Sequence, residues 1–426
     1  MQPLFATLAF LAAAPAQSLA PARIDGASLL REIPSRAELA RLPQPAWTLE
    51  HSTKRLRVDE RGGRREAVLA EVSGPGAFVR LWLADARGKL RLYLGTKAEP
   101  ALVIDAQQLF ALHGAWPALR NSTLAQARLP LSFAAGARLT LECADEPEFE
   151  LAWRSYAPGT AVADWSPPQK GLLDELAAAW EQPPQGPLGQ LSYTFSLSRE
   201  TPAGDFLAAD PALCAGPRAV SEIVLRVDGP DLHAALHGLV LHLAFDGEET
   251  VVCPLAFFFS SLEQDPRLHG PAARDLVARC VMPYRERMDL FVENLGPPDT
   301  HVSGAVYTQA WKWDERSLHF GARWIAARGA TRLSIEGQGQ LVGIVPASVP
   351  LEFRALTAEL DGRKQPLREA LALLERAPFR ERLVFELAEH AEPAPQRVAF
   401  VYLRPGAKFA SRDPQPSDRE SLAADR

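Results

Sequence analysis

The segment from Leu239 to Asn294 constrains the fold of this chain more than any other. It begins with an apolar strand that ends in the turn sequence Phe245-Asp246-Gly247-Glu248. It continues through three phenylalanines at 257–259 to an alternating strand, Met288 to Asn294. A looser copy lies upstream, from Leu90 to Glu142, with the same order of strand, turn, strand, aromatic corner and alternating strand. The copies are separated by roughly 150 residues, the size of a whole domain, so we predict two related β domains in tandem.

The composition indicates folded domains that do not bind nucleic acid. The chain has 426 residues, which is room for two or three domains that each bury a core. Its net charge is −6 and 23% of its residues are charged, so no basic field attracts a nucleic acid. No stretch is long and apolar enough to cross a bilayer. We therefore expect neither a nucleic-acid partner nor a transmembrane segment.

The N-terminus has the pattern of a signal peptide. Leu4 to Ala14 is a short apolar region, and Ala14-Pro15-Ala16 places small residues where a signal peptidase requires them. A disordered, apolar N-terminus of a cytosolic protein is the alternative. We predict a signal peptide over residues 1–16 and a secreted or periplasmic protein.

Turn and strand patterns divide the rest of the chain. We expect a first β domain over residues 27–165, a linker helix within 166–186, a second β domain over 187–405 and a polar, disordered tail over 406–426.

Three segments predict helices within this β pattern. Ala27 to Arg41 predicts a helix or a helix pair, in which Ser35 and Glu38 form a capping box. Leu172 to Trp180 repeats apolar residues at helical spacing and predicts the linker helix. Pro366 to Arg376 has the same spacing, with a proline suited to the first helical turn.

The four cysteines leave the redox chemistry open. Cys143, Cys214, Cys253 and Cys280 permit three pairings if all are oxidised, and their spacing fits no zinc site. Cys253 and Cys280 lie in apolar strands, where a buried free thiol is at least as common as a bridge. The sequence also lacks nucleophile-elbow, zinc-protease, phosphate-loop and dinucleotide motifs, so we expect no metal and no cofactor.

Several short motifs follow one another in an order typical of one family. From the N-terminus they are Leu29-Leu30-Arg31-Glu32, Gly74-Pro75-Gly76, Gly88-Lys89-Leu90-Arg91-Leu92-Tyr93-Leu94, Tyr156-Ala157-Pro158-Gly159-Thr160, Phe245-Asp246-Gly247-Glu248, Cys253-Pro254-Leu255, Met282-Pro283-Tyr284 and Trp313-Asp314-Glu315-Arg316-Ser317. Together they resemble glycoside hydrolase family 172, also catalogued as domain of unknown function 2961, from Ala27 to Leu403. The resemblance implies an all-β fold of two tandem jelly-roll sandwiches with a few short helices. It also implies secretion in many members, oligomers, and activity on fructofuranosides or arabinofuranosides.

The chain departs from the family where its catalysis resides. Active members carry two glutamates, in a Trp-Trp-Gly-Glu-Gly-Asp type motif and a Gly-Thr-Glu-Asp-Tyr type motif, downstream of the strand corresponding to Leu341-Val342-Gly343. Neither motif is present in this sequence. Phe257 also stands where the family carries an acidic residue, and the loop after His51-Ser52 is shorter than in the family. The comparison with the family pattern assigns a catalytic role to no residue of this chain.

Other carboxylates could replace the missing acids, because a glycosidase needs two of them, one with a raised pKa. If the protein is active, Asp314, Glu315 and Glu336 are the first candidates. Asp246-Gly247-Glu248 is better explained as a hairpin turn, since Asp-Gly supplies positive backbone angles. Glu293 is better explained as the solvated end of a strand.

One cluster and two tryptophans suggest a ligand site. Asp314, Arg316 and His319 would converge if a hairpin bend follows Trp313, and such groups bind sugar hydroxyls. An ordinary ion pair at a strand turn is the simpler alternative. Trp313 and Trp82 could stack on a sugar ring, although tryptophans in alternating strands commonly pack in the core.

The main hypothesis is a secreted, non-catalytic relative of family 172 that is associated with carbohydrate or with assembly. The first alternative is an active furanosidase with relocated carboxylates. The second is a structural subunit that forms homo-oligomers or pairs with an active paralogue.

Overall fold

The computed structural model describes residues 23–410, except for segments 33–34, 62, 86, 110–124, 128–129, 143–145, 169–170, 173, 176–188, 198–205, 209–214, 264–274, 298, 326–331, 347–354, 369–375 and 387–396. The predicted signal peptide, Cys143 and Cys214 lie outside the described residues. So does most of the predicted linker helix, of which residues 172, 174 and 175 are described and helical.

The first β-sandwich spans residues 47–156 and packs two five-stranded sheets around one apolar core. One sheet, which we call the inner sheet, has the order β1-β10-β4-β7, with β8 also paired to β4. The other has the order β2-β3-β9-β5-β6. The strands are β1 (Trp47–Ser52), β2 (Arg57–Arg61), β3 (Arg64–Ser73), β4 (Gly76–Leu83), β5 (Lys89–Leu94), β6 (Leu102–Asp105), β7 (Ala125–Ala127), β8 (Leu131–Phe133), β9 (Gly136–Glu142) and β10 (Phe149–Tyr156).

The second sandwich, residues 190–310, repeats this topology except that β2 has no counterpart. Its sheets have the orders β11-β19-β13-β16, with β17 also paired to β13, and β12-β18-β14-β15. The strands are β11 (Gln190–Leu197), β12 (Phe206–Ala208), β13 (Arg218–Asp228), β14 (Leu239–Phe245), β15 (Glu248–Pro254), β16 (Leu276–Ala278), β17 (Met282–Tyr284), β18 (Met288–Asn294) and β19 (His301–Ala310). Together with the first sandwich, it confirms the predicted all-β fold with related β-sandwiches in tandem.

A third sandwich, residues 319–409, follows within the segment that the sequence assigns to one second domain. Its sheets have the orders β20-β27-β22-β25 and β24-β23-β26-β21-β28. The strands are β20 (His319–Ile325), β21 (Arg332–Glu336), β22 (Gly339–Pro346), β23 (Ala355–Leu360), β24 (Arg363–Arg368), β25 (Ala377–Phe379), β26 (Arg382–Glu386), β27 (Arg397–Leu403) and β28 (Lys408–Phe409). A parallel pairing of β15 with β20 joins it to the second sandwich in one eight-stranded sheet.

The second and third sandwiches share a sequence device at their turns. Asp246 has a φ of 54° and accepts hydrogen bonds from three successive backbone N–H groups, at 285–287. Asp361, with a φ of 50°, accepts from three successive N–H groups at 380–382. The clamping segments are Pro283-Tyr284-Arg285-Glu286-Arg287 and Pro378-Phe379-Arg380-Glu381-Arg382. The Asp246-Gly247 hairpin turn expected from the sequence is therefore confirmed, and it recurs in the third sandwich.

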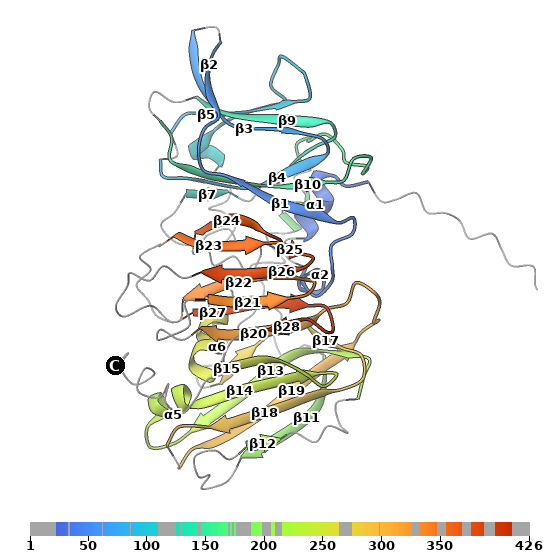
Figure 1. Ribbon diagram of the computed structural model, residues 1–426, viewed down its shortest axis with the longest axis vertical. Helices are drawn as coiled ribbons and strands as arrows, with labels where there is room; N and C mark the ends of the chain where they lie inside the picture. The colour runs from blue at the N-terminus through green and yellow to red at the C-terminus, as the bar shows by residue number, and fades with distance from the viewer. Residues whose placement is uncertain are drawn as a thin grey trace, which may run out of the picture.

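The three sandwiches are stacked along the longest axis of the molecule, with the third one between the other two (Figure 1). Strands of the third sandwich are consequently buried on both faces: Phe400 lies in the core shared with the second sandwich, and Val401 lies in the next core. The first sandwich adds Trp47 and Leu49 from the outer face of its inner sheet to that next core. Cover on both sides explains why every residue of β20 is buried and why β27 has a continuous apolar run from Val398 to Leu403.

Short helices complete the fold. They are α1 (Gly26–Glu32), α2 (Arg36–Leu39), α5 (Leu232–Gly238) and α6 (Leu255–Glu263). As predicted, the first segment is a helix pair, and the Ser35 side chain accepts a hydrogen bond from the N–H of Glu38 at 3.3 Å. We call residues 23–42 the N-terminal strap, because they pair at Ile24 with the segment after the first sandwich and at Arg41 with the loop before β20.

Two local predictions are wrong. Pro366 lies in strand β24 rather than at the start of a helix, and β24 is the edge of its sheet, where a residue without an N–H is tolerated. The chain is also ordered beyond residue 405, because β28 pairs with β21. Residues 369–375 and 411–426 lie outside the described residues.

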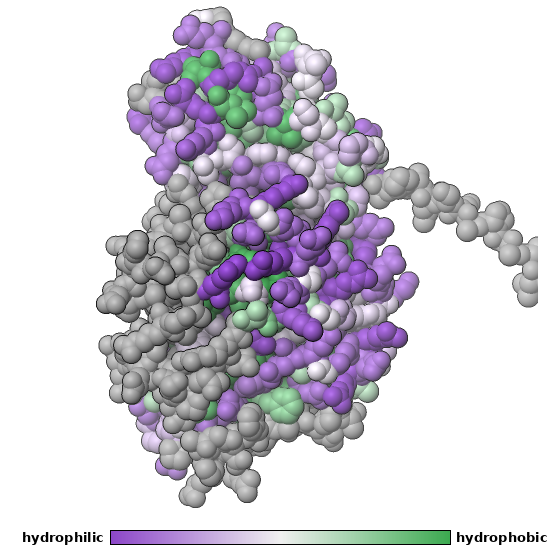
Figure 2. Space-filling model, viewed as in Figure 1, coloured by the Kyte–Doolittle hydropathy of each residue, from purple (hydrophilic) through white to green (hydrophobic). Residues whose placement is uncertain are grey.

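The surface agrees with this layered core. In the view of Figure 2, green residues are most visible on the first sandwich, whereas the coloured part of the lower stack is mostly hydrophilic. Cys253 and Cys280 are buried free thiols inside the molecule. Burial raises the pKa of Cys253 well above its ordinary value.

Candidate functional site

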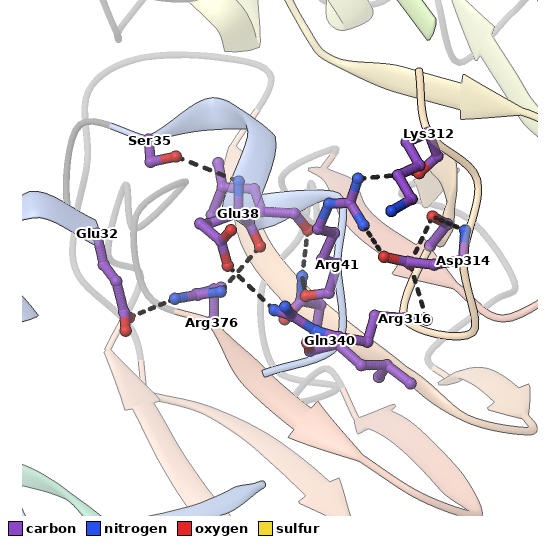
Figure 3. Close-up of polar contacts among 12 residues, drawn as sticks. Glu32, Ser35, Glu38, Arg41, Lys312, Asp314, Arg316, Gln340 and Arg376 are labelled. Atoms are coloured by element: carbon purple, nitrogen blue, oxygen red, sulfur yellow. Dashed lines mark hydrogen bonds and ion pairs between the residues drawn. The ribbon is translucent and has the colours of Figure 1, made fainter. Parts of the chain in front are cut away.

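Asp314 closes the loop between β19 and β20. Its Oδ1 accepts hydrogen bonds from the N–H of Arg316 and from Ser317 Oγ, both at 3.0 Å, and its Oδ2 pairs with Arg41 (Figure 3). Burial raises the pKa of this carboxyl, but the Ser317 hydrogen bond and the Arg41 charge outweigh it, so the pKa is lowered. Asp314 is thus an ionised anchor between this loop and the strap.

Arg316 also holds the strap rather than an open site. Its Nε donates to the carbonyl of Leu42 at 2.8 Å, and its Nη2 lies 3.2 Å from the Glu38 carboxylate. Gln340, which is fully buried in the third sandwich, donates to the carbonyls of Leu39 and Arg41 (Figure 3). The two Gln340 hydrogen bonds join segments about 300 positions apart in the sequence. Together with the contacts of Arg316, they hold the strap against the third sandwich and the loop before β20.

A buried ion group lies at the other end of the strap. Glu32 pairs with Arg154 of β10 at 2.7 Å and with Arg376 (Figure 3). Burial raises the pKa of Glu32, but the charges of the two arginines lower it by more. Arg376 also donates to the carbonyl of Glu38 at 2.8 Å. We call Glu32, Arg154 and Arg376 the strap triad, and it connects the strap to the first and third sandwiches.

His319 points to a different partner from the one the sequence suggests. The fully buried imidazole has Nε2 2.9 Å from Asp246 Oδ2 and Nδ1 3.7 Å from Glu248 Oε2. The ring of Trp313 lies 5.3 Å from it, centroid to centroid. Glu248 in turn accepts from the N–H of Gly406 at 2.7 Å. These contacts lock the β14–β15 turn to the third sandwich.

The predicted site residues are therefore not brought together. Asp314 and Arg316 bind the strap, while His319 and Trp313 lie at the β14–β15 turn. Glu315 is exposed, and Glu336 is exposed on β21, where its backbone pairs with Arg382 and Lys408. No contact joins the three predicted acids Asp314, Glu315 and Glu336 among the interactions of the described residues. The simpler interpretation of Asp314, an ion pair at a strand turn, is the one the geometry supports.

Trp82 lies in a second polar group that the sequence did not single out. On the outer face of the inner sheet, Arg80 and Trp82 of β4 neighbour Glu150 of β10, and His51 of β1 lies across Ala152 from Arg80. Arg80 Nη2 pairs with Glu150 Oε1, and His51 Nδ1 lies 3.7 Å from the same oxygen. The side chains of His51, Arg80 and Glu150 are 2–3% exposed. We call these residues the inner-sheet polar group.

The sequence carried a signal for this group. In an alternating strand, Arg80 and Trp82 share one face, and the opposite face holds the core residues Leu81 and Leu83. A charged residue on a strand that is buried on both sides requires a partner. The partners, His51 and Glu150, come from strands 29 positions before and 70 positions after Arg80, so spacing alone does not reveal them.

A third group lies on the second sandwich. His242 of β14 has Nδ1 2.9 Å from Glu249 Oε1 and Nε2 3.4 Å from Glu293 Oε2. The hydrogen bond from His242 lowers the pKa of Glu249 by more than burial raises it. Glu293 is thus placed beside an imidazole rather than at a purely solvated strand end.

The described part of the chain contains neither a metal site nor a membrane-spanning helix. Among the described residues, no three His, Cys, Asp or Glu side chains are arranged to hold a metal ion. None of the described helices is long and apolar enough to cross a membrane.

Comparisons with known proteins identify the first sandwich. Residues 46–171 match the family model of the GH172 first β-sandwich domain, which confirms the resemblance to family 172 that the sequence motifs indicate. A comparison with curated proteins gives no match.

Two solved structures show low similarity. The major capsid protein P2 of bacteriophage PM2 is 9% identical with a TM-score of 0.31, over 52% of this chain and 99% of that one. The tandem CBM51 modules of the family 98 glycoside hydrolase Sp3GH98 from Streptococcus pneumoniae SP3-BS71 are 7% identical with a TM-score of 0.16, over 46% and 80%. At these TM-scores neither similarity informs function.

Proposed function

Because this family 172-like chain carries the family's first β-sandwich domain, we propose that it is a non-catalytic relative that is exported and associated with carbohydrate. The observation that carries the proposal is the engagement of Asp314, the first of the predicted acids, in the strap. A retaining or inverting glycosidase needs one carboxyl with a raised pKa to protonate the leaving oxygen. Asp314 has a lowered pKa and is paired with Arg41.

Two further carboxylates, Asp246 and Glu249, support the same proposal. Burial raises the pKa of Asp246, but the His319 hydrogen bond and three backbone N–H groups lower it to about 2. An acid that stays ionised to such a low pH cannot donate a proton at neutral pH. Glu249 has a lowered pKa as well. These groups suit structural roles better than acid catalysis.

The test is hydrolysis of nitrophenyl furanosides and pyranosides by purified protein without residues 1–16. An active family 172 enzyme serves as the positive control, and circular dichroism verifies that the chain is folded. We expect no turnover above the uncatalysed rate. Turnover that is abolished by a single carboxylate substitution would refute the non-catalytic proposal.

The competing proposal is a furanosidase with relocated carboxylates, and the His242 group favours it specifically. Glu249 and Glu293 both contact one imidazole, at 2.9 Å from Nδ1 and 3.4 Å from Nε2 of His242. Under this proposal, Glu293→Gln removes activity and leaves the fold intact. The exposed Glu336, also a candidate, provides the matched variant Glu336→Gln. Asp314→Asn and Glu315→Gln complete the set.

Export and assembly are parts of the proposal with their own tests. The apolar segment before Ala16 supports export, and N-terminal sequencing of protein recovered outside the cytoplasm would identify the cleavage site. A homo-oligomer or a complex with an active paralogue would appear in size-exclusion chromatography with light scattering. A monomer at micromolar concentration would count against an assembly role.

A further inference from the structure

We propose that Asp246, Glu248 and His319 form a latch between the second and third sandwiches, which tightens when the His319 imidazole takes up a proton. The latch begins from a mismatch at His319, whose side chain is fully buried. Its Nε2 lies 2.9 Å from Asp246 Oδ2. Its Nδ1 makes no hydrogen bond to the described residues, although Glu248 Oε2 lies 3.7 Å away. Buried polar atoms are nearly always hydrogen-bonded, so this nitrogen requires an explanation.

The Asp246 carboxylate determines which nitrogen of the neutral imidazole carries the hydrogen. Burial raises the pKa of Asp246, but the hydrogen bonds from His319 and three backbone N–H groups lower it to about 2, so at neutral pH this carboxylate only accepts. A neutral imidazole donates from one nitrogen and accepts at the other. Nε2 is therefore the donor, and the lone pair of Nδ1 faces Glu248, whose ionised carboxylate also only accepts.

A second proton on the imidazole removes this mismatch. Nδ1 then becomes a donor, and the Glu248 side chain can rotate from 3.7 Å to hydrogen-bond distance. Such charge-assisted hydrogen bonds are roughly twice as strong as neutral ones. The resulting imidazolium lies between two carboxylates, which offsets the cost of burying its charge. Because the Glu248 side chain is 38% exposed, the group is in contact with solvent, from which the proton comes.

The other charged groups on the elements around His319 are exposed or engaged elsewhere. The exposed ones are Arg285, Glu286, Glu315 and Lys408. The engaged ones are Asp314 with Arg41, Arg287 with Asp289, Glu249 with His242, and Arg404 with Gln338. Aromatic rings form further contacts, since Phe245 and Trp313 have centroids 5.9 Å and 5.3 Å from the imidazole, and Tyr284 stacks behind Phe245. Among the described residues, the ionisable groups in contact with His319 are thus Asp246 and Glu248.

The position of the latch gives the proton its structural effect. Asp246 binds the clamping segment of the second sandwich, and His319 is the first residue of β20 in the third. Glu248 accepts from the N–H of Gly406, in the turn between β27 and β28, at 2.7 Å. A bond from His319 to Glu248 therefore fixes the β14–β15 turn more firmly against the third sandwich. This tightening appears as the pH falls through the range in which histidines titrate, about pH 6.5, and it is lost as the pH rises.

The first experiment is nitrogen-15 NMR of the full chain with labelled histidine side chains between pH 8 and pH 5. The chain has nine histidines, and His319→Gln or the shift caused by Glu248→Gln identifies the His319 signals. We expect hydrogen on Nε2 alone at pH 8 and on both nitrogens at pH 5. Hydrogen on Nδ1 alone at pH 8, or a neutral imidazole at pH 5, overturns the latch.

Hydrogen exchange at the Gly406 amide then measures the tightening. After correction for the intrinsic exchange rate, its protection should rise about fivefold from pH 8 to pH 5, the effect of one added hydrogen bond. Glu248→Gln should abolish the rise, because a glutamine can accept from Gly406 with its oxygen and donate to the neutral imidazole with its nitrogen. Constant protection in the parent, or an equal rise in Glu248→Gln, overturns the latch.

Glu286→Gln is the matched control, since it removes an exposed carboxylate from the clamping segment and should retain the fivefold rise. Both decisive variants keep the shape of the replaced glutamate, so the fold is expected to survive. The latch holds whether or not the protein is catalytic or binds carbohydrate, because neither measurement involves a sugar. Hydrolysis of furanosides would refute the proposed function and leave the latch in place.

Discussion

Two buried polar groups each include a residue on the same face of β10. They differ in how completely their polar atoms are hydrogen-bonded. Glu150 and Arg154 both project from the outer face of β10, four residues apart. Arg154 belongs to the strap triad, whose ion pairs and hydrogen bond to the carbonyl of Glu38 are 2.8 Å or shorter. Glu150 belongs to the inner-sheet polar group, where His51 makes no hydrogen bond to the described residues.

The difference separates a fully satisfied group from one that contains an unsatisfied imidazole. Burying charge is costly unless pairing and hydrogen bonds compensate it, and the strap triad has that compensation within the chain. In the inner-sheet polar group, Arg80 is paired with Glu150, whereas His51 makes no hydrogen bond to the described residues. Breaking the strap triad should therefore lower stability, whereas removing the His51 imidazole should not.

The largest effect is expected when the strap triad is broken. Glu32→Gln removes the carboxylate that Arg154 and Arg376 share, and leaves two buried guanidinium groups facing each other. Removing one partner of a fully buried pair costs about 3–5 kcal/mol, and the partial exposure of Glu32 reduces this to about 2 kcal/mol. Urea unfolding monitored by tryptophan fluorescence measures the loss.

A control shows whether the loss comes from the triad. Glu315→Gln removes an exposed carboxylate in the loop before β20 and should change the free energy of unfolding by less than about 0.5 kcal/mol. If Glu32→Gln is equally mild, the strap triad contributes nothing to stability and the comparison with the inner-sheet polar group fails.

The sequence correctly predicted those features that depend on residues close together in the chain. The alternation of strands, the Asp246-Gly247 turn and the Ser35 cap are local, since each follows from backbone angles or from hydrogen bonds across a few residues. The Pro366 helix was wrong for a local reason as well: proline fits both the first turn of a helix and an edge strand, and apolar spacing did not decide between them.

The site depended on contacts between distant segments. Asp314 meets Arg41 from a position 273 residues away, and His319 meets Asp246 from a position 73 residues away. Spacing therefore suggested one cluster of Asp314, Arg316 and His319 where the fold forms two. The third sandwich was missed although its clamp sequence repeats that of the second, because β24 and β25 carry a weaker strand pattern than β14 and β18.

An intermediate loss of stability is expected when Asp246 is replaced. Like the strap triad, its carboxylate has hydrogen-bond partners within the chain, but it lies at a turn. Its pKa is about 2 in the folded protein, below the usual value, so its ionised form stabilises the fold. This contribution is complete above pH 4 and is lost as the pH falls toward 2. After allowance for solvent screening, Asp246→Asn should cost about 1–2 kcal/mol at pH 7 and less at pH 3.

Asp361 sharpens this prediction because it makes the same three backbone contacts without a histidine. Asparagine tolerates the positive φ of both positions, so the backbone turn is retained in either variant. Thermal unfolding between pH 3 and pH 7 should show a larger pH-dependent loss for Asp246→Asn than for Asp361→Asn. Equal losses would mean that His319 adds nothing to the clamp.

The smallest effect, and the one with the opposite sign, is expected at His51. His51→Leu replaces a buried, unsatisfied imidazole by an apolar side chain on the strand that already contributes Leu49 and Trp47 to an apolar core. Removal of an unsatisfied buried polar group stabilises by about 1 kcal/mol, even after some loss of packing. The variant should therefore unfold at a slightly higher urea concentration than the parent. A residue that only supports the fold gives the reverse result, in which stability falls when it is replaced. If His51→Leu destabilises the chain by 1 kcal/mol or more, as estimated for satisfied polar groups, then His51 belongs with the strap triad, and the two groups on β10 do not differ in kind.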